Sequence, residues 1–178
     1  MKFTLFLIIF ISTILNCNGQ SSKEFFKSGS AKYLHADFRG AIQDYNKAIE
    51  LQPTNGNFYY CRGTAKACMS NYQAAILDFN KAIQINPKDA GAYSQRGCSK
   101  YYLGDYQSAM LDQNKAIAIN PKYAIAYGNR GLVKHMLGDD QSGIQDINKA
   151  IEIDPKNIDA YYNRGLVRSY LKFFSGAI

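Results

Sequence analysis

The sequence predicts an all-α solenoid of stacked antiparallel helical hairpins, and three observations support this fold class. The dipeptide Arg-Gly recurs every 34 residues, and the four prolines of the chain recur at the same spacing. Each interval also contains two stretches in which apolar and small residues follow the helical period. A period of this length indicates a unit that buries its apolar face only by stacking on copies of itself. The arginines are Arg62, Arg96, Arg130 and Arg164, and the prolines are Pro53, Pro87, Pro121 and Pro155.

Residues 90–123 show how one interval predicts a hairpin of two helices. Gly104 suits the end of the first helix, where a positive φ is needed, and Asp105 suits the start of the second helix. Pro121 prevents the second helix from continuing. Two short antiparallel helices in each interval follow from this pattern.

Residues 1–19 precede the repeats and predict a secretory signal peptide. They contain one early lysine, a long apolar run and a small polar stretch before the expected cleavage site after Gly19. The run is short for a bilayer span, so we expect a mature chain of residues 20–178 without a stable transmembrane span. The mature chain would be exported to the periplasm, the outer membrane or the medium. Two alternatives are a lipid anchor at Cys17, for which Asn16 is a poor fit, and an uncleaved anchor.

Export would leave three cysteines in an oxidising compartment, so they cannot all pair with one another. Cys61 and Cys68 are separated by about 10 Å along one predicted helix, which is beyond disulfide reach. A bridge from Cys61 to Cys98 in the next repeat stays open. The favoured interpretation is that these thiols fill small gaps between helices.

Several further positions recur at the same spacing. The aromatic position is Phe25, Tyr59, Tyr93, Tyr127 and Tyr161, and the glycine is Gly29, Gly63, Gly97, Gly131 and Gly165. The first alanine is Ala41, Ala75, Ala109 and Ala177, with Gly143 in the fourth repeat, and the second is Ala48, Ala82, Ala116 and Ala150. This pattern resembles the tetratricopeptide repeat (TPR) family. The resemblance implies an α-solenoid whose first helices line a concave groove, and a general role in binding proteins or peptides. It gives four full repeats and a truncated fifth, over residues 22–55, 56–89, 90–123, 124–157 and 158–178.

Two ladders of opposite charge accompany the repeats. The arginines lie on the first helices, and the second helices carry Asp44, Asp78, Asp112 and Asp146. The arginines could form a cationic strip for an anionic ligand, or structural ion pairs between packed helices. At about 100° per residue, Arg96 lies on the packing side of its helix near Tyr93, which favours structural pairs. Pairing each aspartate with the arginine 18 residues later leaves none unmatched, so we expect Asp146 to meet Arg164. Lys32 could instead serve Asp44.

The opposite side of the first helices is the expected ligand groove. Its predicted lining for a protein or peptide is Tyr60, Thr64, Tyr101, Tyr102, Asn129, His135, Tyr162 and Asn163, with Leu132, Met136 and Leu166. Aromatic, amide and apolar groups can stack on side chains and hydrogen-bond a peptide. Some family members hold a C-terminal carboxylate with lysine, asparagine and arginine at set groove positions. The corresponding residues here are Phe26, Ser30, Cys61, Gly91 and Gln95, so an acidic tail is not the expected ligand.

The sequence offers little for catalysis. His35 and His135 lie in different repeats without metal-ligand spacing, and no phosphate loop or nucleophile elbow occurs. We therefore expect no catalytic residue, metal or cofactor. The net charge of +7 could favour nucleic acid, but many lysines recur on the solvated second helices, so no nucleic-acid partner is expected. The predicted function is a non-enzymatic scaffold or adaptor. The alternative is an accessory or regulatory domain of a longer protein with another module beyond Ile178.

The last ten residues, SYLKFFSGAI, match the start of a second helix and then stop. The side chains of Tyr161, Leu166 and Tyr170 on the fifth first helix should then be partly uncovered. An exposed apolar end of a solenoid favours association. We expect self-association through residues 158–178, or a chain that is part of a longer repeat array.

Overall fold

The structure is a computed structural model that describes residues 21–175, with side chains described from residue 21 to residue 171. Over residues 21–175 it consists of nine α-helices and contains no strand. The expected signal peptide, Cys17 and residues 176–178 lie outside this range. The helices are α2 (Ser22–Leu34), α3 (Phe38–Leu51), α4 (Gly56–Cys68), α5 (Tyr72–Ile85), α6 (Ala90–Tyr102), α7 (Tyr106–Ile119), α8 (Ala124–Met136), α9 (Asp140–Ile153) and α10 (Ile158–Ser175).

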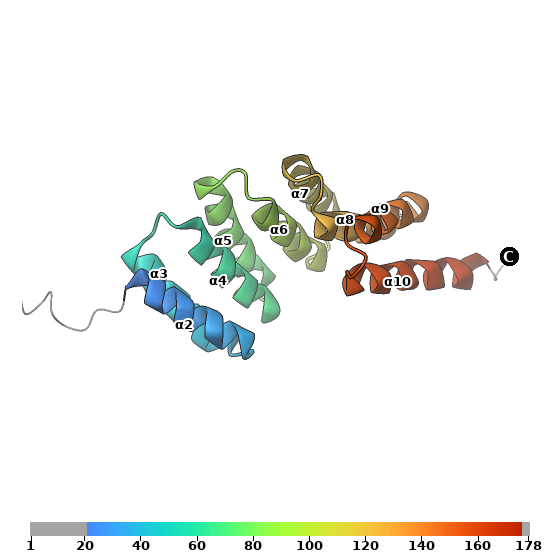
Figure 1. The fold of residues 1–178 in the computed structure, drawn as a ribbon. Coiled ribbons are helices and arrows are strands. Elements are labelled where there is room, and N and C mark those ends of the chain that lie inside the picture. Colours follow the sequence, from blue (N-terminus) through green and yellow to red (C-terminus); the bar gives the residue numbers. More distant parts are fainter. Residues whose placement is uncertain (1–20, 176–178) are drawn as a thin grey trace, which may run out of the picture.

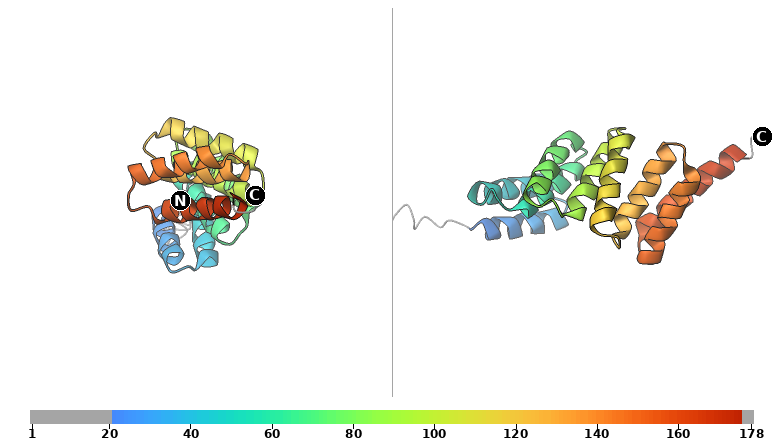
Figure 2. Two further views of the ribbon diagram at one scale, coloured as in Figure 1. Left: turned by 90° about the vertical axis from the view of Figure 1, so that its right-hand side faces the viewer. Right: turned by 90° about the horizontal axis from the view of Figure 1, so that it is seen from above.

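The helices form consecutive hairpins that follow one another along a single axis, with α2 and α10 at opposite ends (Figure 1, Figure 2). The hairpins are α2–α3, α4–α5, α6–α7 and α8–α9, and α10 follows as a single helix. Each first helix contacts the first helix of the next hairpin, whereas no second helix contacts another second helix within the described part of the chain. The first helices therefore lie closer together and form the concave side. The predicted all-α solenoid is confirmed.

The turn inside each hairpin combines a residue of positive φ with a helix cap. Gly104 has a φ of 82°, and the Asp105 carboxylate then accepts a hydrogen bond from an amide in the first turn of α7. Ala36 and Ser70 hold the same position in the first two hairpins with φ values of 60° and 59°. The predicted end of one helix at Gly104 and start of the next at Asp105 are therefore confirmed.

Glycine at the centre of each first helix allows the second helix of the same hairpin to approach closely. A Cβ atom on Gly131 would lie 2.6 Å from the carbonyl oxygen of Gly143 and 2.6 Å from Cγ1 of Ile147. Side chains do not tolerate such distances, so only glycine fits between α8 and α9. The same close approach, at 2.6–2.9 Å from the built Cβ atom, occurs at Gly29, Gly63 and Gly97.

Small and large residues alternate in the interface beneath these glycines. Fully buried alanines hold the helices close together: Ala41, Ala48, Ala75, Ala82, Ala109, Ala116 and Ala150. One large residue of each second helix then fills the space under the glycine. In the first, second and fourth hairpins it is Tyr45, Phe79 or Ile147, and in the third it is the fully buried Gln113.

The fifth repeat differs from its expected form. A second helix was expected near Phe174, but α10 continues without a break to Ser175. The physical reason lies in the turn, because Lys172 and Phe173 occupy the positions of Gly104 and Asp105 and supply neither a left-handed residue nor a cap. The expected exposure of the apolar side chains is present: Tyr161 is 44% exposed, Leu166 39% and Tyr170 47%.

The helix glycines offer a direct test of this packing. We expect Gly131→Ala to lower the free energy of unfolding by about 1–3 kcal/mol, because the added methyl group overpacks the α8–α9 contact. A Cβ atom on Gly165 would meet nothing within 4 Å. Gly165→Ala should therefore be neutral or stabilise by up to about 1 kcal/mol through helix propensity. Urea unfolding followed by circular dichroism measures both, and equal effects would contradict the packing assigned to Gly131.

Candidate functional site

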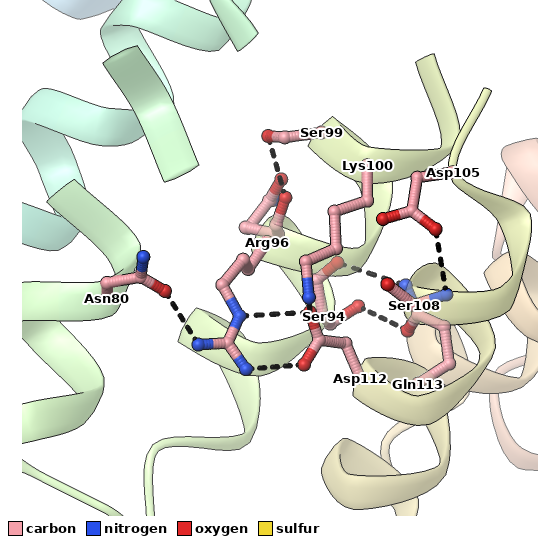
Figure 3. Close-up of polar contacts among 10 residues, drawn as sticks. Asn80, Ser94, Arg96, Ser99, Lys100, Asp105, Ser108, Asp112 and Gln113 are labelled. Carbon is pink, nitrogen blue, oxygen red and sulfur yellow. Dashed lines mark hydrogen bonds and ion pairs between the residues drawn. The ribbon is translucent and has the colours of Figure 1, made fainter. Parts of the chain in front are cut away.

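An arginine fork connects the helices within and between repeats. Arg96 on α6 donates from Nε and Nη2 to the two carboxylate oxygens of Asp112 on α7, at 2.9 and 2.5 Å (Figure 3). Its third nitrogen, Nη1, donates to the side-chain oxygen of Asn80 on α5 at 2.7 Å. One guanidinium group thus binds its own hairpin and the preceding hairpin.

The fork recurs with little change in the neighbouring repeats. Arg62 binds Asp78 and Asn46, and Arg130 binds Asp146 and Asn114, with nitrogen–oxygen distances of 2.6–2.9 Å. Each guanidinium also lies over the tyrosine three residues earlier, at 5.3–5.5 Å from the ring centroid. The structural interpretation of these three arginines fits the geometry, because every nitrogen of the fork has a protein partner.

The predicted partners were wrong. Each of these arginines pairs with the aspartate 16 residues later in its own repeat, and not with the aspartate 18 residues earlier. Two positions along a helix turn a side chain by about 200°, so Asp44 and Asn46 face opposite sides of α3. Asp44 faces its own hairpin, and Asn46 faces the next hairpin, where it accepts from Arg62. The contact between repeats is therefore arginine to asparagine.

The two ends of the ladder differ from its centre. Asp44 accepts from the Ser28 hydroxyl at 2.6 Å and pairs with Lys32 at 2.7 Å, so the alternative partner considered for it is correct. Burial opposes ionisation of Asp44, but these two contacts outweigh it and lower the pKa of the carboxyl group. Arg164, at the other end, donates to Asn148 at 3.0 Å and has no carboxylate within ion-pair distance among residues 21–171. The expected Asp146–Arg164 pair does not form.

Lysines complete the neutralisation of the first helices. Lys66, Lys100 and Lys134 each lie 2.8 Å from the aspartate that the arginine of the same repeat binds. Helices α4, α6 and α8 each contain one arginine, one lysine and no acidic residue. All of these positive charges are therefore held by aspartates on the second helices, away from the concave side.

The concave side contains an apolar hollow near the N-terminal end of the array. Tyr60, Cys61 and Thr64 of α4 line it, together with Tyr33 of α2 and Tyr45 of α3. Its volume is about 130 Å³, and its lining includes no charged side chain. This N-terminal hollow has room for one apolar side chain, since cavities of about 150 Å³ hold benzene.

The centre of the concave side is polar without being charged. The Ser94 hydroxyl donates to Oε1 of Gln113 at 2.9 Å and accepts from Nδ2 of Asn129 at 3.3 Å. Gln113 in turn donates from Nε2 to the backbone oxygen of Ser94 at 3.0 Å, and Figure 3 shows Ser94 and Gln113 beside the arginine fork. A small central hollow of about 40 Å³ adjoins this group. It is lined by Cys98, Tyr101, Tyr102, Gln113, Asn129, Leu132 and Val133.

The cysteines are free thiols in the described residues. Burial raises the pKa of Cys98 to about 12 and that of Cys61 to about 11, so both thiols stay protonated at neutral pH. Cys68 is exposed, and its sulfur lies 3.4 Å from the Tyr33 hydroxyl. The interpretation of gap-filling thiols therefore suits Cys61 and Cys98, but it is wrong for Cys68.

The remaining predicted groove residues divide into two groups. Tyr162 is 70% exposed, while Asn163 is 8% exposed at the edge of a hollow that it shares with Asn129. His135 is not free to meet a ligand, because Nδ1 lies 2.5 Å from Asp140 and the ring packs on Tyr170. The side chain of His135 is only 9% exposed, so it supports the groove from below.

Sequence reasoning missed three residues of these hollows. Tyr33 and Tyr45 line the N-terminal hollow, and Gln113 underlies the central hollow. Gln113 carried a visible signal, because the other repeats have a large apolar or aromatic residue at its position. Tyr33 and Tyr45 carried no comparable signal, since an aromatic residue on a helix face is ordinarily a packing residue.

Metal and membrane sites were also sought in residues 21–175. No group of three or more histidine, cysteine, aspartate or glutamate side chains in this range could hold a metal ion. No helix in the same range is long and apolar enough to cross a bilayer.

Removing an arginine fork should cost more inside the array than at its end. We expect Arg130→Ala to lower the free energy of unfolding by about 3 kcal/mol, because Asp146 is nearly buried and keeps only Lys134. Arg164→Ala should cost about 1 kcal/mol or less, since it removes a contact with Asn148 but leaves no buried carboxylate behind. Denaturant unfolding of both variants tests this, and equal losses would show that the Asp146 pair contributes nothing.

The lowered pKa of Asp44 predicts how stability depends on pH. The contribution of Asp44 is present above its usual pKa of 3.8 and is lost as the pH falls through the lowered folded value. Asp44→Asn should therefore destabilise the chain near neutral pH, and the difference from the parent should shrink at about pH 3. Urea unfolding at both pH values measures the difference, and a gap that widens in acid would contradict this assignment.

Comparisons with known proteins follow the same architecture. Models of the tetratricopeptide repeat match residues 58–89, 90–123 and 124–157, and related models match residues 29–67 and 147–172. No curated protein matches the chain by sequence.

Three solved structures illustrate the likeness. The crystal structure of MamA is 30% identical with a TM-score of 0.69, and the match covers 81% of this chain and 84% of that chain. The TPR domain of Arabidopsis OM64 is 27% identical with a TM-score of 0.64, covering 65% and 95%. The first TPR of Spaghetti (RPAP3), bound to the HSP90 peptide SRMEEVD, is 22% identical with a TM-score of 0.61, covering 66% and 94%. The chain therefore belongs to the tetratricopeptide repeat family.

Proposed function

We propose that this chain is a non-enzymatic scaffold that holds an uncharged segment of a partner protein on the concave face of α4, α6 and α8. The observation that carries this proposal is the neutralisation of those helices. Each of their arginines and lysines is bound to an aspartate of its own repeat. What remains on the concave side is aromatic, amide, hydroxyl and apolar.

The two hollows suggest how such a segment would bind. The N-terminal hollow would accept one apolar side chain among the rings of Tyr33, Tyr45 and Tyr60. The amide of Asn129 and the hydroxyls of Tyr101 and Tyr102 would hydrogen-bond the peptide backbone at the centre. An extended peptide with an apolar anchor and few charges satisfies both hollows.

The comparison with RPAP3 supports a peptide ligand and also marks a difference. That protein is bound to the peptide SRMEEVD, which contains three acidic residues. An acidic segment would need free cations in the groove, and here they are already paired with aspartates. The ligand proposed for this chain is therefore not an acidic tail.

The proposed place of action is an exported compartment. Its support is the pattern of residues 1–19, an early lysine and an apolar run before Gly19. Mass spectrometry of the N-terminus of the chain from its producing cells tests this. A chain that begins at Gln20 supports cleavage, a lipidated Cys17 supports the anchored alternative, and an intact Met1 in a cytoplasmic fraction contradicts export.

The proposed groove predicts a specific binding result. Partners captured by the full chain should persist at high salt, because few charged contacts contribute. The double variant Tyr101→Ala with Asn129→Ala should lose them, with at least about tenfold weaker binding, while the helix content stays unchanged. Lys115→Ala, an exposed change on α7, is the matched control and should bind as the parent does.

Either of two results would contradict this groove. Loss of the partner with Lys115→Ala would indicate a site on the second helices. Binding that falls steeply with salt would indicate a charged partner such as nucleic acid.

A further inference from the structure

The last helix presents an interface that every complete repeat covers. In α4, α6 and α8, the central arginine and glycine face the second helix of the same hairpin. Helix α10 has the same residues, Arg164 and Gly165, but it contacts only α8 and α9 on its inner side. Figure 1 shows no helix beyond α10 at this end of the array. The outer face of α10 is therefore a copy of an interior surface.

The polar part of this face is already in its binding position. Arg164 donates from Nη1 to Asn148 at 3.0 Å, and its guanidinium lies 5.2 Å from the centre of the Tyr161 ring. Both contacts repeat those of the arginines that bind aspartate. The Nε and Nη2 groups, which elsewhere bind the carboxylate, have no carboxylate partner among residues 21–171. The fork therefore has two donors directed toward an acid that the described chain does not supply.

The steric part of the face is open in the same place. A Cβ atom on Gly165 would meet nothing within 4 Å, whereas the built Cβ atoms on Gly97 and Gly131 would lie 2.6 Å from their neighbours. Gly165 is exposed, while the other two glycines are buried. A helix backbone can thus approach α10 at Gly165 as closely as the second helices approach the first helices.

The four complete repeats show what such a helix must carry. Their second helices share a small residue, then an aspartate three positions later, a large residue next to it, and an alanine three positions further on. In each repeat the aspartate binds the basic residues, and the large residue packs under the glycine. The sets are Ala41, Asp44, Tyr45 and Ala48; Ala75, Asp78, Phe79 and Ala82; Ala109, Asp112, Gln113 and Ala116; and Gly143, Asp146, Ile147 and Ala150.

We propose that the outer face of α10 binds one amphipathic helix of a partner protein that carries this pattern. The pattern is alanine or glycine, two residues, aspartate, a large residue, two residues and alanine. Charge complementarity argues against a second copy of α10 as the occupant, because Arg164 and Arg168 would then face the same residues. The helices of this chain that carry the pattern, α3, α5, α7 and α9, are already packed in their own hairpins.

A peptide tests the proposal without knowledge of the natural partner. The probe is residues 139–155 of this chain, DDQSGIQDINKAIEIDP, which contain the pattern of α9. Fluorescence anisotropy of the labelled peptide with the full chain should show saturable binding that weakens with salt. The same peptide with Asp146→Asn should bind at least about tenfold more weakly, because it lacks the carboxylate for the fork.

Variants of the full chain complete the test. Arg164→Gln should weaken binding of the parent peptide about tenfold and should abolish the preference for aspartate over asparagine. Gly165→Ala should also weaken binding, although it leaves the melting temperature unchanged or raises it, because the methyl group blocks only an incoming helix. Tyr101→Ala in the concave groove should bind the peptide as the parent does, which separates this site from the groove.

Three results would overturn the proposal. The first is a peptide that does not bind at all, and the second is binding that is indifferent to Asp146→Asn and to Gly165→Ala. The third is a full chain that self-associates without peptide and becomes a monomer on Gly165→Ala, since the occupant of this face would then be a second copy.

Discussion

The rest of this structure depends on a planar guanidinium group that binds two helices at once. In the second, third and fourth repeats it forms two parallel bonds to an aspartate of its own hairpin and one bond to an asparagine of the preceding hairpin. Lysine could not replace it, because a single ammonium group cannot match both oxygens of a carboxylate and reach the asparagine in a fixed plane. The fork therefore sets the spacing inside each hairpin and the stacking between hairpins with one side chain.

This use of charge decides what the concave face can recognise. The first helices are basic in sequence, yet their positive groups point to the second helices and end on nearly buried aspartates. A ligand on the concave side therefore meets rings, amides and hydroxyls. The neutral groove is thus a consequence of how the hairpins are held together, and the proposed preference for an uncharged segment rests on that relation.

The 34-residue period was sufficient to predict the helices, the turn at Gly104 and the side of each first helix that forms the groove, because these depend on local spacing. The ion pairs were not predictable by counting, since complete matching ignored the direction of each side chain. Asn46 and its equivalents recur two positions after each aspartate, and about 200° of helical rotation identifies them as the contact between repeats. The contact of His135 with Asp140 depends on a rotamer, so no sequence pattern could have excluded it from the groove.

A repeat array also contains information about its own ends. Each interior interface is formed from the same few residues, so the surface left at the last helix has the chemistry of the surfaces that are covered elsewhere. Arg164 keeps the contacts of an interior arginine with asparagine and tyrosine, which hold the guanidinium in place before any acid arrives. A preorganised donor pair loses little conformational entropy when it binds a carboxylate, and Gly165 removes the steric barrier to a helix that brings one. The end of the array is therefore better suited to a helix with an aspartate beside a large residue than to an arbitrary apolar surface.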